Sequence, residues 1–172
     1  MIATIDKTEV GEYYFTYINQ VPADRDVLEV LELQIPETVE LLRSISETQS
    51  RHRYAPGKWT IREVVGHVND VERLFVFRAF WFARGLKEPL PSFDQEVAAR
   101  ENGADERALS SHIDEFRAIR AATLTFFREL SSDAWLRRGV ASGNPFSVRA
   151  LAYITAGHVA HHNRILREKY LA

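Results

Sequence analysis

The chain has 172 residues, of which 45% are hydrophobic, and its formal net charge is −2. A chain of this length can bury one good core, so we expect a single domain over residues 1–172. Charges of both signs are intermixed without a basic stripe, and no run of about eighteen apolar residues is available to span a bilayer. We therefore expect neither nucleic acid nor a membrane as a partner.

Two further features bear on location and chemistry. Residues 1–15, MIATIDKTEVGEYYF, have neither the apolar core nor the small-residue cleavage site of a signal peptide, which predicts a cytoplasmic protein. Cysteine is absent, and this excludes disulfides, thiolate metal ligands and a cysteine nucleophile. Any thiol chemistry would therefore need an external thiol.

The first predicted elements are an arm and a helix. The aromatic-rich residues 8–26 contain Val21-Pro22 and predict an ordered N-terminal arm or short helix that meets a turn. From Asp24, a candidate N-cap, apolar residues at helical spacing predict a helix that ends at Ile45. Pro36 lies inside this helix, where it removes an amide donor and clashes with the preceding turn. We expect a kink or a break there.

The second predicted helix follows the turn YAPGKW, residues 54–59. Thr60 and Glu63 form the Thr-x-x-Glu capping box that is typical of a helix start. The helix is expected to end near Gly85. Its predicted inner face comprises Val64, His67, Val68, Val71, Leu74, Phe75 and Arg78.

The rest of the chain predicts a long connection and two more helices. Residues 85–105 contain two prolines and two glycines, and a connection of this length is typical of a functional loop over a site. Periodicity predicts a third helix over residues 109–130, a turn over 131–147 and a fourth helix thereafter, with no convincing strand pattern. The predicted fold is all-α, an antiparallel four-helix bundle with a long crossover loop.

Three of the six histidines lie in TAGHVAHHNR, residues 155–164. His158 and His162 are four residues apart, so their rings share one helix face. If the second and fourth helices pack face to face, the ring of His67 reaches the same point. Three neutral imidazoles suit a zinc-class or nickel-class ion and leave a position open for water or substrate.

The same residues also fit a structural interpretation, in which core histidines are satisfied by nearby carboxylates or backbone carbonyls. Glu63 and Asp70 flank His67 at i−4 and i+3, and either can accept the ring N–H that orients a metal ligand. A pair of His158 and His161 is geometrically possible. We expect His161 instead on the flank of the helix or in a dimer seam.

The two remaining histidines lack convergent partners, so neither is expected to be a metal ligand. His52 stands between two arginines before a turn and is expected to be solvated. His112, on the third helix, is expected on the helix flank.

Residues 54–79 (YAPGKWTIREVVGHVNDVERLFVFRA) and 156–170 (AGHVAHHNRILREKY) resemble the DinB/YfiT superfamily. The arm YYFTYINQVP and the loop PLPSFDQE extend this resemblance over nearly the whole chain. The resemblance implies a bundle of four helices, often dimeric, with a divalent metal held by three histidines. Position by position, the ligands correspond to His67 in GHVND and to His158 and His162 in GHVAHH.

The resemblance also implies a function class, because some relatives transfer low-molecular-weight thiols such as bacillithiol or mycothiol, and others are isomerases or amidases. An open metal position can bind a thiol as thiolate near neutral pH and aim it at an electrophile. Our first hypothesis is therefore a transferase that uses a low-molecular-weight thiol. Trp59 and Arg164 can help to hold an anionic thiol, although core packing and surface charge are their simpler interpretations.

Two alternatives remain open. In a metal-dependent hydrolase, the ion would lower the pKa of a bound water toward about 7, and Glu63 or Asp70 would carry the proton as the catalytic carboxylate. In a nonenzymatic metal-binding helical protein, the run FVFRAFWFAR would serve a helix interface. The expected partners are a small-molecule substrate and a second copy of the chain in a homodimer. Imidazole ligands do not choose between zinc, nickel, iron and copper.

Overall fold

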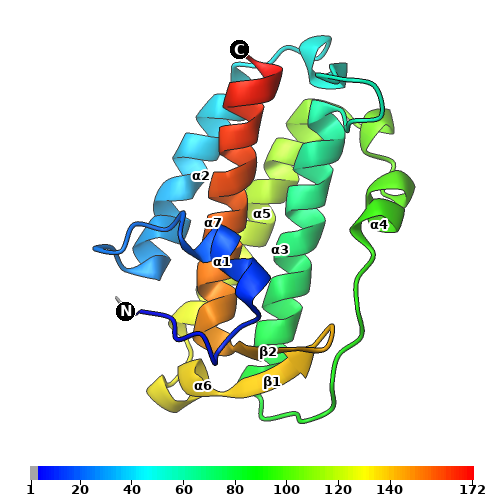
Figure 1. Ribbon diagram of the computed structural model, residues 1–172. Helices are drawn as coiled ribbons and strands as arrows, with labels where there is room; N and C mark the ends of the chain where they lie inside the picture. Colours follow the sequence, from blue (N-terminus) through cyan, green and yellow to red (C-terminus); the bar gives the residue numbers. More distant parts are fainter. Residues whose placement is uncertain (1–3) are drawn as a thin grey trace.

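Four long helices form the body of the computed structural model, which describes residues 4–172 (Figure 1). These helices are α2 (Val27–Arg43), α3 (Ile61–Ala83), α5 (Leu109–Arg128) and α7 (Val148–Ile165). Helix α7 packs against α3 and α2, and α5 packs against the same two helices. The order around the bundle is therefore α2, α7, α3, α5, and the predicted four-helix bundle is confirmed.

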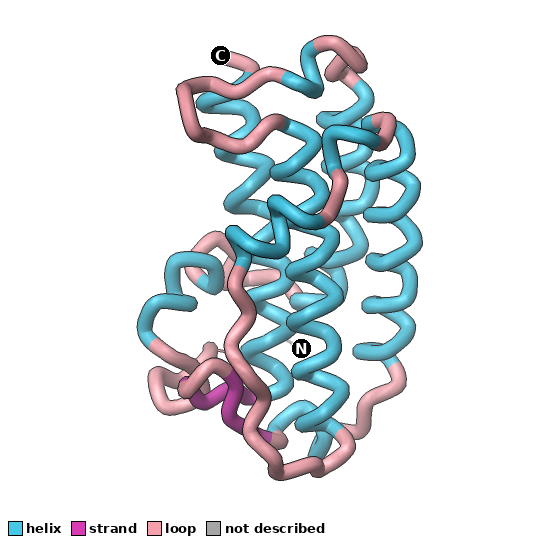
Figure 2. The backbone as a smooth tube through the Cα atoms, turned by 90° about the vertical axis from the view of Figure 1, so that its right-hand side faces the viewer, coloured by secondary structure: helices cyan, strands magenta, loops and turns pink. Residues whose placement is uncertain are grey.

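The connection between α3 and α5 determines the direction of the helices. It comprises residues 84–108, includes α4 (Gln95–Glu101) and a 3-10 turn at Ala104–Glu106, and runs along the outside of the bundle (Figure 2). Because it returns the chain to the starting end of α3, α3 and α5 run in the same direction (Figure 1). The antiparallel neighbours are α3 with α7 and α2 with α5. The predicted long crossover is present.

Short elements surround the bundle: most of them lie at its two ends, and one short N-terminal helix lies across its side (Figure 1). They are a 3-10 turn (Glu12–Tyr14), α1 (Phe15–Ile18), a 3-10 turn (Gln49–Arg51), α6 (Ser132–Leu136), β1 (Arg138–Ala141), β2 (Asn144–Ser147) and a π-helical turn (Leu166–Tyr170). Between residues 4 and 172, no helix is long and apolar enough to cross a membrane.

The hairpin of β1 and β2 was not expected from the sequence, which predicted a turn in this region. Its strands have four residues each, too few for an alternating pattern to stand out. Ser142 and Gly143 have φ angles of 51° and 71°, which are typical of a type I′ hairpin turn.

The hairpin fastens two distant segments to the same end of the bundle. The amide of Leu90 donates to the carbonyl of Val140 at 2.9 Å, and the amide of Ser142 donates to the carbonyl of Leu90 at 3.1 Å. The amide of Ser147 donates to the carbonyl of Glu9 at 2.9 Å. The first part of the crossover and the N-terminal arm are therefore both held by the hairpin.

The starts of α2 and α3 are fixed by side-chain caps. The predicted capping box is present: the Thr60 hydroxyl accepts from the amide of Glu63 at 3.0 Å, and the Glu63 carboxylate accepts from the amide of Thr60 at 2.7 Å. In α2 the cap is Asp26, whose carboxylate accepts from the amide of Leu28 at 2.9 Å. The prediction of Asp24 as the cap was wrong by two residues.

A kink or a break was expected at Pro36. The break does not occur, and α2 is continuous from Val27 to Arg43. Proline removes the amide that would bind the carbonyl of Glu32, four residues earlier. Both residues are exposed, so water can bind that carbonyl. The inner face of the helix, with Leu31 and Val39 buried, is preserved on both sides of the proline.

A buried polar network joins all four long helices. Arg120 on α5 has no exposed surface, and its Nε and Nη2 donate to the two carboxylate oxygens of Glu72 on α3, each at 2.8 Å. Its Nη1 donates to the Leu31 carbonyl at 2.8 Å and to Gln34 Oε1 at 3.0 Å, both on α2. Gln34 Nε2 donates in turn to the Ala156 carbonyl on α7 at 2.8 Å.

Replacing Arg120 by methionine leaves the Glu72 carboxylate buried without its cation. We expect Arg120→Met to lower the free energy of unfolding by about 3–5 kcal/mol, measured by urea denaturation. The double variant Glu72→Leu with Arg120→Met removes the stranded charge and should recover much of this loss. A loss below about 1 kcal/mol in the single variant would show that the pair does not stabilise the bundle.

Candidate metal centre

Three histidine rings converge between α3 and α7. The Nε2 atom of His67 lies 3.2 Å from Nε2 of His158, and Nε2 of His162 lies 3.1 Å from the same atom. The potential ligand atoms of the three rings all lie within 4.8 Å of one another. The convergence expected from the four-residue spacing and from the packing of α3 on α7 is therefore present.

Two glycines allow the chain to close over this cluster, and each directly precedes one of its histidines. A Cβ at Gly157 would lie 2.0 Å from the carbonyl oxygen of Tyr17, so the arm can approach α7 only at a residue without a side chain. A Cβ at Gly66 would lie 2.9 Å from Nδ2 of Asn102 in the crossover. The arm and the crossover thus contact the bundle beside the histidines.

The arrangement of the nitrogens fits a cation better than a set of hydrogen bonds. A single ring nitrogen offers either one hydrogen or one lone pair. Nε2 of His158 has two nitrogen neighbours, at 3.2 and 3.1 Å, and cannot make a good hydrogen bond with both. Around a tetrahedral zinc ion, ligand nitrogens lie about 3.3–3.4 Å apart. The three histidines therefore form a donor set that suits a divalent metal.

Burial keeps these imidazoles neutral, which is the form that binds metals. It lowers the pKa of His67 to about 4. Burial, reinforced by the neighbouring histidines, lowers the pKa of His158 and of His162 well below the usual value of 6.5. The buried Nδ1 of His162 has no hydrogen-bond partner in the described part of the chain. The tautomer of this ring is therefore set by what its Nε2 binds.

The two predicted catalytic carboxylates are engaged elsewhere. The Glu63 carboxylate accepts from Arg53 Nη1 and from the Thr60 amide, both at 2.7 Å, so the capping box turns it toward the helix start. Asp70, whose pKa is raised by burial, accepts from Asn102 Nδ2 at 3.4 Å. Within residues 4–172, neither carboxylate hydrogen-bonds a histidine of the cluster. Their predicted proton-transfer role has no contact to support it.

The two residues predicted to hold a cofactor lie in different places. The ring of Trp59 packs on the ring of His67, with centroids 4.8 Å apart, and lines a pocket together with His162. Arg164 is exposed and pairs with Glu168 at 3.1 Å. It lines neither pocket beside the histidines. Trp59 is therefore at the site, whereas no contact within the described residues connects Arg164 to it.

The other histidines stand outside the cluster. Nδ1 of His161 lies 3.1 Å from Nε2 of Gln20 on the arm, which agrees with the predicted flank position. His52 is exposed, as predicted. The flank position predicted for His112 was wrong: only 1% of this residue is exposed, and its Nε2 lies 3.0 Å from the carbonyl oxygen of Ala104. The crossover covers this part of α5.

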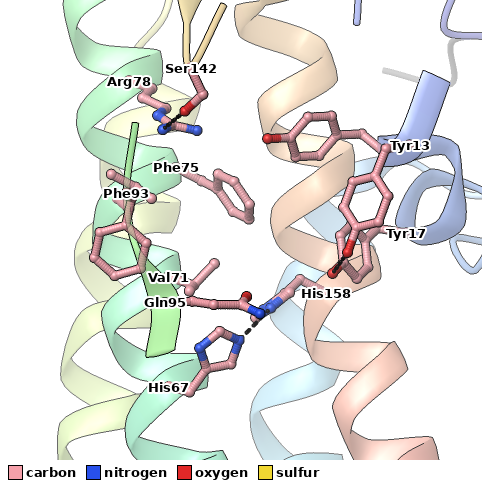
Figure 3. A pocket seen from close by; sticks show the side chains of 12 residues that line it. Tyr13, Tyr17, His67, Val71, Phe75, Arg78, Phe93, Gln95, Ser142 and His158 are labelled. Carbon is pink, nitrogen blue, oxygen red and sulfur yellow. Dashed lines mark hydrogen bonds between the residues drawn. The ribbon is translucent and has the colours of Figure 1, made fainter. Parts of the chain in front are cut away.

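Two pockets reach the histidine cluster. One, with a volume of about 130 Å³, is lined by His67 and His158, and the other, of about 380 Å³, by His162. Gln95, the first residue of α4, lines both. Figure 3 shows Gln95 beside the two rings of the smaller pocket, with Phe93 from the same crossover further along its wall.

Neither Gln95 nor Phe93 was found by sequence reasoning. The available signal was the length and the proline content of the crossover, which predicted a functional loop over a site. That expectation agrees with the crossover's place on the walls of both pockets. The individual residues depend on how the crossover folds back on α3, and no local pattern encodes this.

The metal-free protein is expected to become less stable as the pH falls from about 6.5 to about 4. The pKa of His67 is about 4 when folded, against an ordinary 6.5, so the unfolded chain binds a proton in this range that the folded chain excludes. This residue alone should remove about 3 kcal/mol of unfolding free energy. Denaturation in the presence of a chelator at several pH values measures the loss.

In the same experiment, His67→Gln should reduce the loss of unfolding free energy, because His158 and His162 still contribute to it. His52→Gln, which replaces an exposed histidine outside the cluster, is the matched control. Equal stability of the native chain at both ends of the pH range would contradict the prediction.

Among the solved structures that match this fold are the following two. YfiT from Bacillus subtilis, described as a probable metal-dependent hydrolase with an unusual four-helix bundle topology, matches with a TM-score of 0.72 and 17% identity, over 86% of this chain and 90% of YfiT. A mycothiol-dependent maleylpyruvate isomerase matches with a TM-score of 0.69 and 15% identity, over 86% of this chain. The match spans 61% of the isomerase.

At the level of sequence, no curated protein gives a match. The sequence model of the DinB superfamily matches residues 31–166 of this chain, which include all three histidines of the cluster. Because this match covers most of the chain and the fold agrees with it, the protein belongs to the DinB superfamily.

Proposed function

We propose that this protein is a divalent-metal-dependent enzyme whose ion is held by His67, His158 and His162. The observation that carries the proposal is the convergence of three neutral imidazoles, two buried and one half-buried, beside two pockets. When bound, the ion would act as a Lewis acid and lower the pKa of a thiol or a water at its open coordination position. The description of YfiT as a probable metal-dependent hydrolase supports the same class of chemistry.

The surroundings of the histidines favour a thiol as the activated group, and therefore a thiol transferase. Hydrolysis needs a group that carries protons, and the carboxylates of Glu63 and Asp70 are bound to other partners. A thiol whose pKa falls below the ambient pH needs no such base. The chain has no cysteine, so the thiol must be a separate small molecule. The mycothiol dependence of the isomerase with this fold supports this choice.

The larger pocket suits the thiol cosubstrate. At about 380 Å³ it falls within the range of about 300–1,000 Å³ that is usual for small-molecule sites. Trp59 and Tyr54 offer aromatic surface, while Lys58 and Glu96 offer charges of both signs for the polar groups of a small thiol. We therefore assign to Lys58 the role of holding an anionic thiol, which the sequence predicted for Arg164.

A metal-dependent hydrolase is the second candidate, and the description of YfiT favours it. Both candidates use the same histidines and a small-molecule substrate, and they differ in whether a thiol is required. The homodimer and the cytoplasmic location stay predictions.

Metal content is the first test. Protein purified without a histidine tag should contain about one equivalent of zinc or nickel per chain by elemental analysis. His158→Ala should lose the metal, because it removes the nitrogen that both other rings approach. His52→Ala, at an exposed position, should retain it. A native chain that stays metal-free after incubation with either ion would contradict the proposal.

Thiol dependence separates the two candidate activities. Metal-loaded protein should accelerate the conjugation of a small thiol such as N-acetylcysteine to 1-chloro-2,4-dinitrobenzene, and His67→Ala should abolish the acceleration. Cleavage of p-nitrophenyl acetate without any thiol would instead identify a hydrolase. Metal binding without either activity would favour the nonenzymatic alternative.

A further inference from the structure

The buried arginines of the bundle differ in whether they pair with a carboxylate. Among residues 4–172, three arginine side chains are buried, and two of them have a carboxylate partner. Arg62 pairs with Glu47, and Arg120 pairs with Glu72. Arg78 on α3 is only 2% exposed, and none of the ion pairs of the described chain includes it. Its positive charge is therefore buried without a counterion.

The contacts of Arg78 are with uncharged groups. Its Nη2 donates to Ser142 Oγ at 2.8 Å and to the Pro91 carbonyl at 3.5 Å. The guanidinium carbon lies 5.7 Å from the ring centre of Phe146. Nε has no hydrogen-bond partner in the described structure. Burial lowers the pKa of Arg78, yet arginine remains protonated in proteins, so its charge needs an anion.

Arg78 lines the same cavity as two histidines of the cluster. Figure 3 shows Arg78 at one end of this cavity and His67 with His158 at the other. The side chains of Phe75 and Phe93 lie between the two ends. The cavity therefore has a cationic end, an apolar middle and an end formed by neutral imidazoles.

We propose that this cavity binds a small organic carboxylate, with its carboxylate on Arg78 and its reacting group at the histidines. The contact of the reacting group with the histidines rests on the proposed function, whereas the contact of the carboxylate with Arg78 does not. A guanidinium binds a carboxylate through two parallel hydrogen bonds. Arg78 is the one cationic side chain among the described residues that line the cavity, so a single negative charge balances it.

The size of the cavity limits the rest of the ligand. Its volume of about 130 Å³ lies below the range of about 300–1,000 Å³ that is usual for drug-sized ligands. Phe75, Phe93 and Val71 leave an apolar surface for the carbon chain between the carboxylate and the reacting group. The substrate class is thus a short-chain acid that carries an electrophilic or metal-binding group away from its carboxylate.

Binding to zinc-loaded protein tests the inference directly, with 3-mercaptopropionate and its methyl ester as probes in calorimetry. The two probes share a thiol for the metal end and differ in the charge at the other end. We expect the acid to bind at least about tenfold more tightly than the ester. Arg78→Met should remove this preference while retaining the metal. Equal binding of acid and ester by the native chain would overturn the inference and leave the metal site intact.

A metal-free measurement keeps the two proposals separable. If the native chain holds no metal, the proposed function fails, and butanoate and methyl butanoate are compared by thermal denaturation. Butanoate should raise the melting temperature of the native chain, whereas methyl butanoate should not. In Arg78→Met, neither compound should raise it. No difference between the two compounds would overturn the carboxylate site as well.

The stability of the variants provides a further check. Arg78→Met removes an unpaired charge, so it should leave the melting temperature unchanged or raised, whereas Arg120→Met should lower it. A loss in Arg78→Met as large as that in Arg120→Met would assign Arg78 a structural role instead. If Arg78→Met does not fold, Arg78→Lys replaces it, and the acid and ester comparison on the native chain still decides.

Discussion

The arrangement of the bundle depends on the buried ion pair of Arg120 and Glu72. Two charges removed from water are tolerated only where the geometry satisfies nearly all their hydrogen bonds, so the pair restricts how α5 and α3 can pack. Through Gln34 the network extends to the Ala156 carbonyl, two residues before His158. A rotation of α7 that moved its histidines away from α3 would also break this network. The ion pair and the histidine cluster therefore require the same packing of the helices.

Much of this arrangement was predictable because it follows from local rules. Helical periodicity and a capping box predicted α3, and the four-residue spacing placed His158 and His162 on one face. At Glu63, two local rules compete for one side chain. Glu63 lies one turn from His67, but as the third residue of the capping box its carboxylate binds the Thr60 amide. The hairpin and the walls of the pockets could not be predicted, because they depend on contacts between segments distant in sequence.

The smaller cavity combines two electrostatic conditions that a stable core would avoid. At one end, burial makes protonation of His67 and His158 unfavourable, so these rings can accept a cation. At the other end, Arg78 carries a charge that no carboxylate of residues 4–172 balances. An ion on the histidines would make both ends positive, and an anionic ligand between them would relieve the repulsion. A metal ion at the histidines and the charge of Arg78 would thus be coupled electrostatically through a ligand that occupies the cavity.

The close contacts at Gly66 and Gly157 have a consequence for how such a protein can diversify. At both positions the covering segment meets the bundle beside a histidine, and the covers also supply part of the pocket lining, such as Tyr17 and Gln95. Insertions or exchanges in the arm and the crossover would reshape what reaches the centre, while the ligands remain on rigid helices. The long helices keep the histidines in place, while the arm and the crossover can vary in sequence and length. In such an architecture the range of ligands can evolve faster than the histidine cluster.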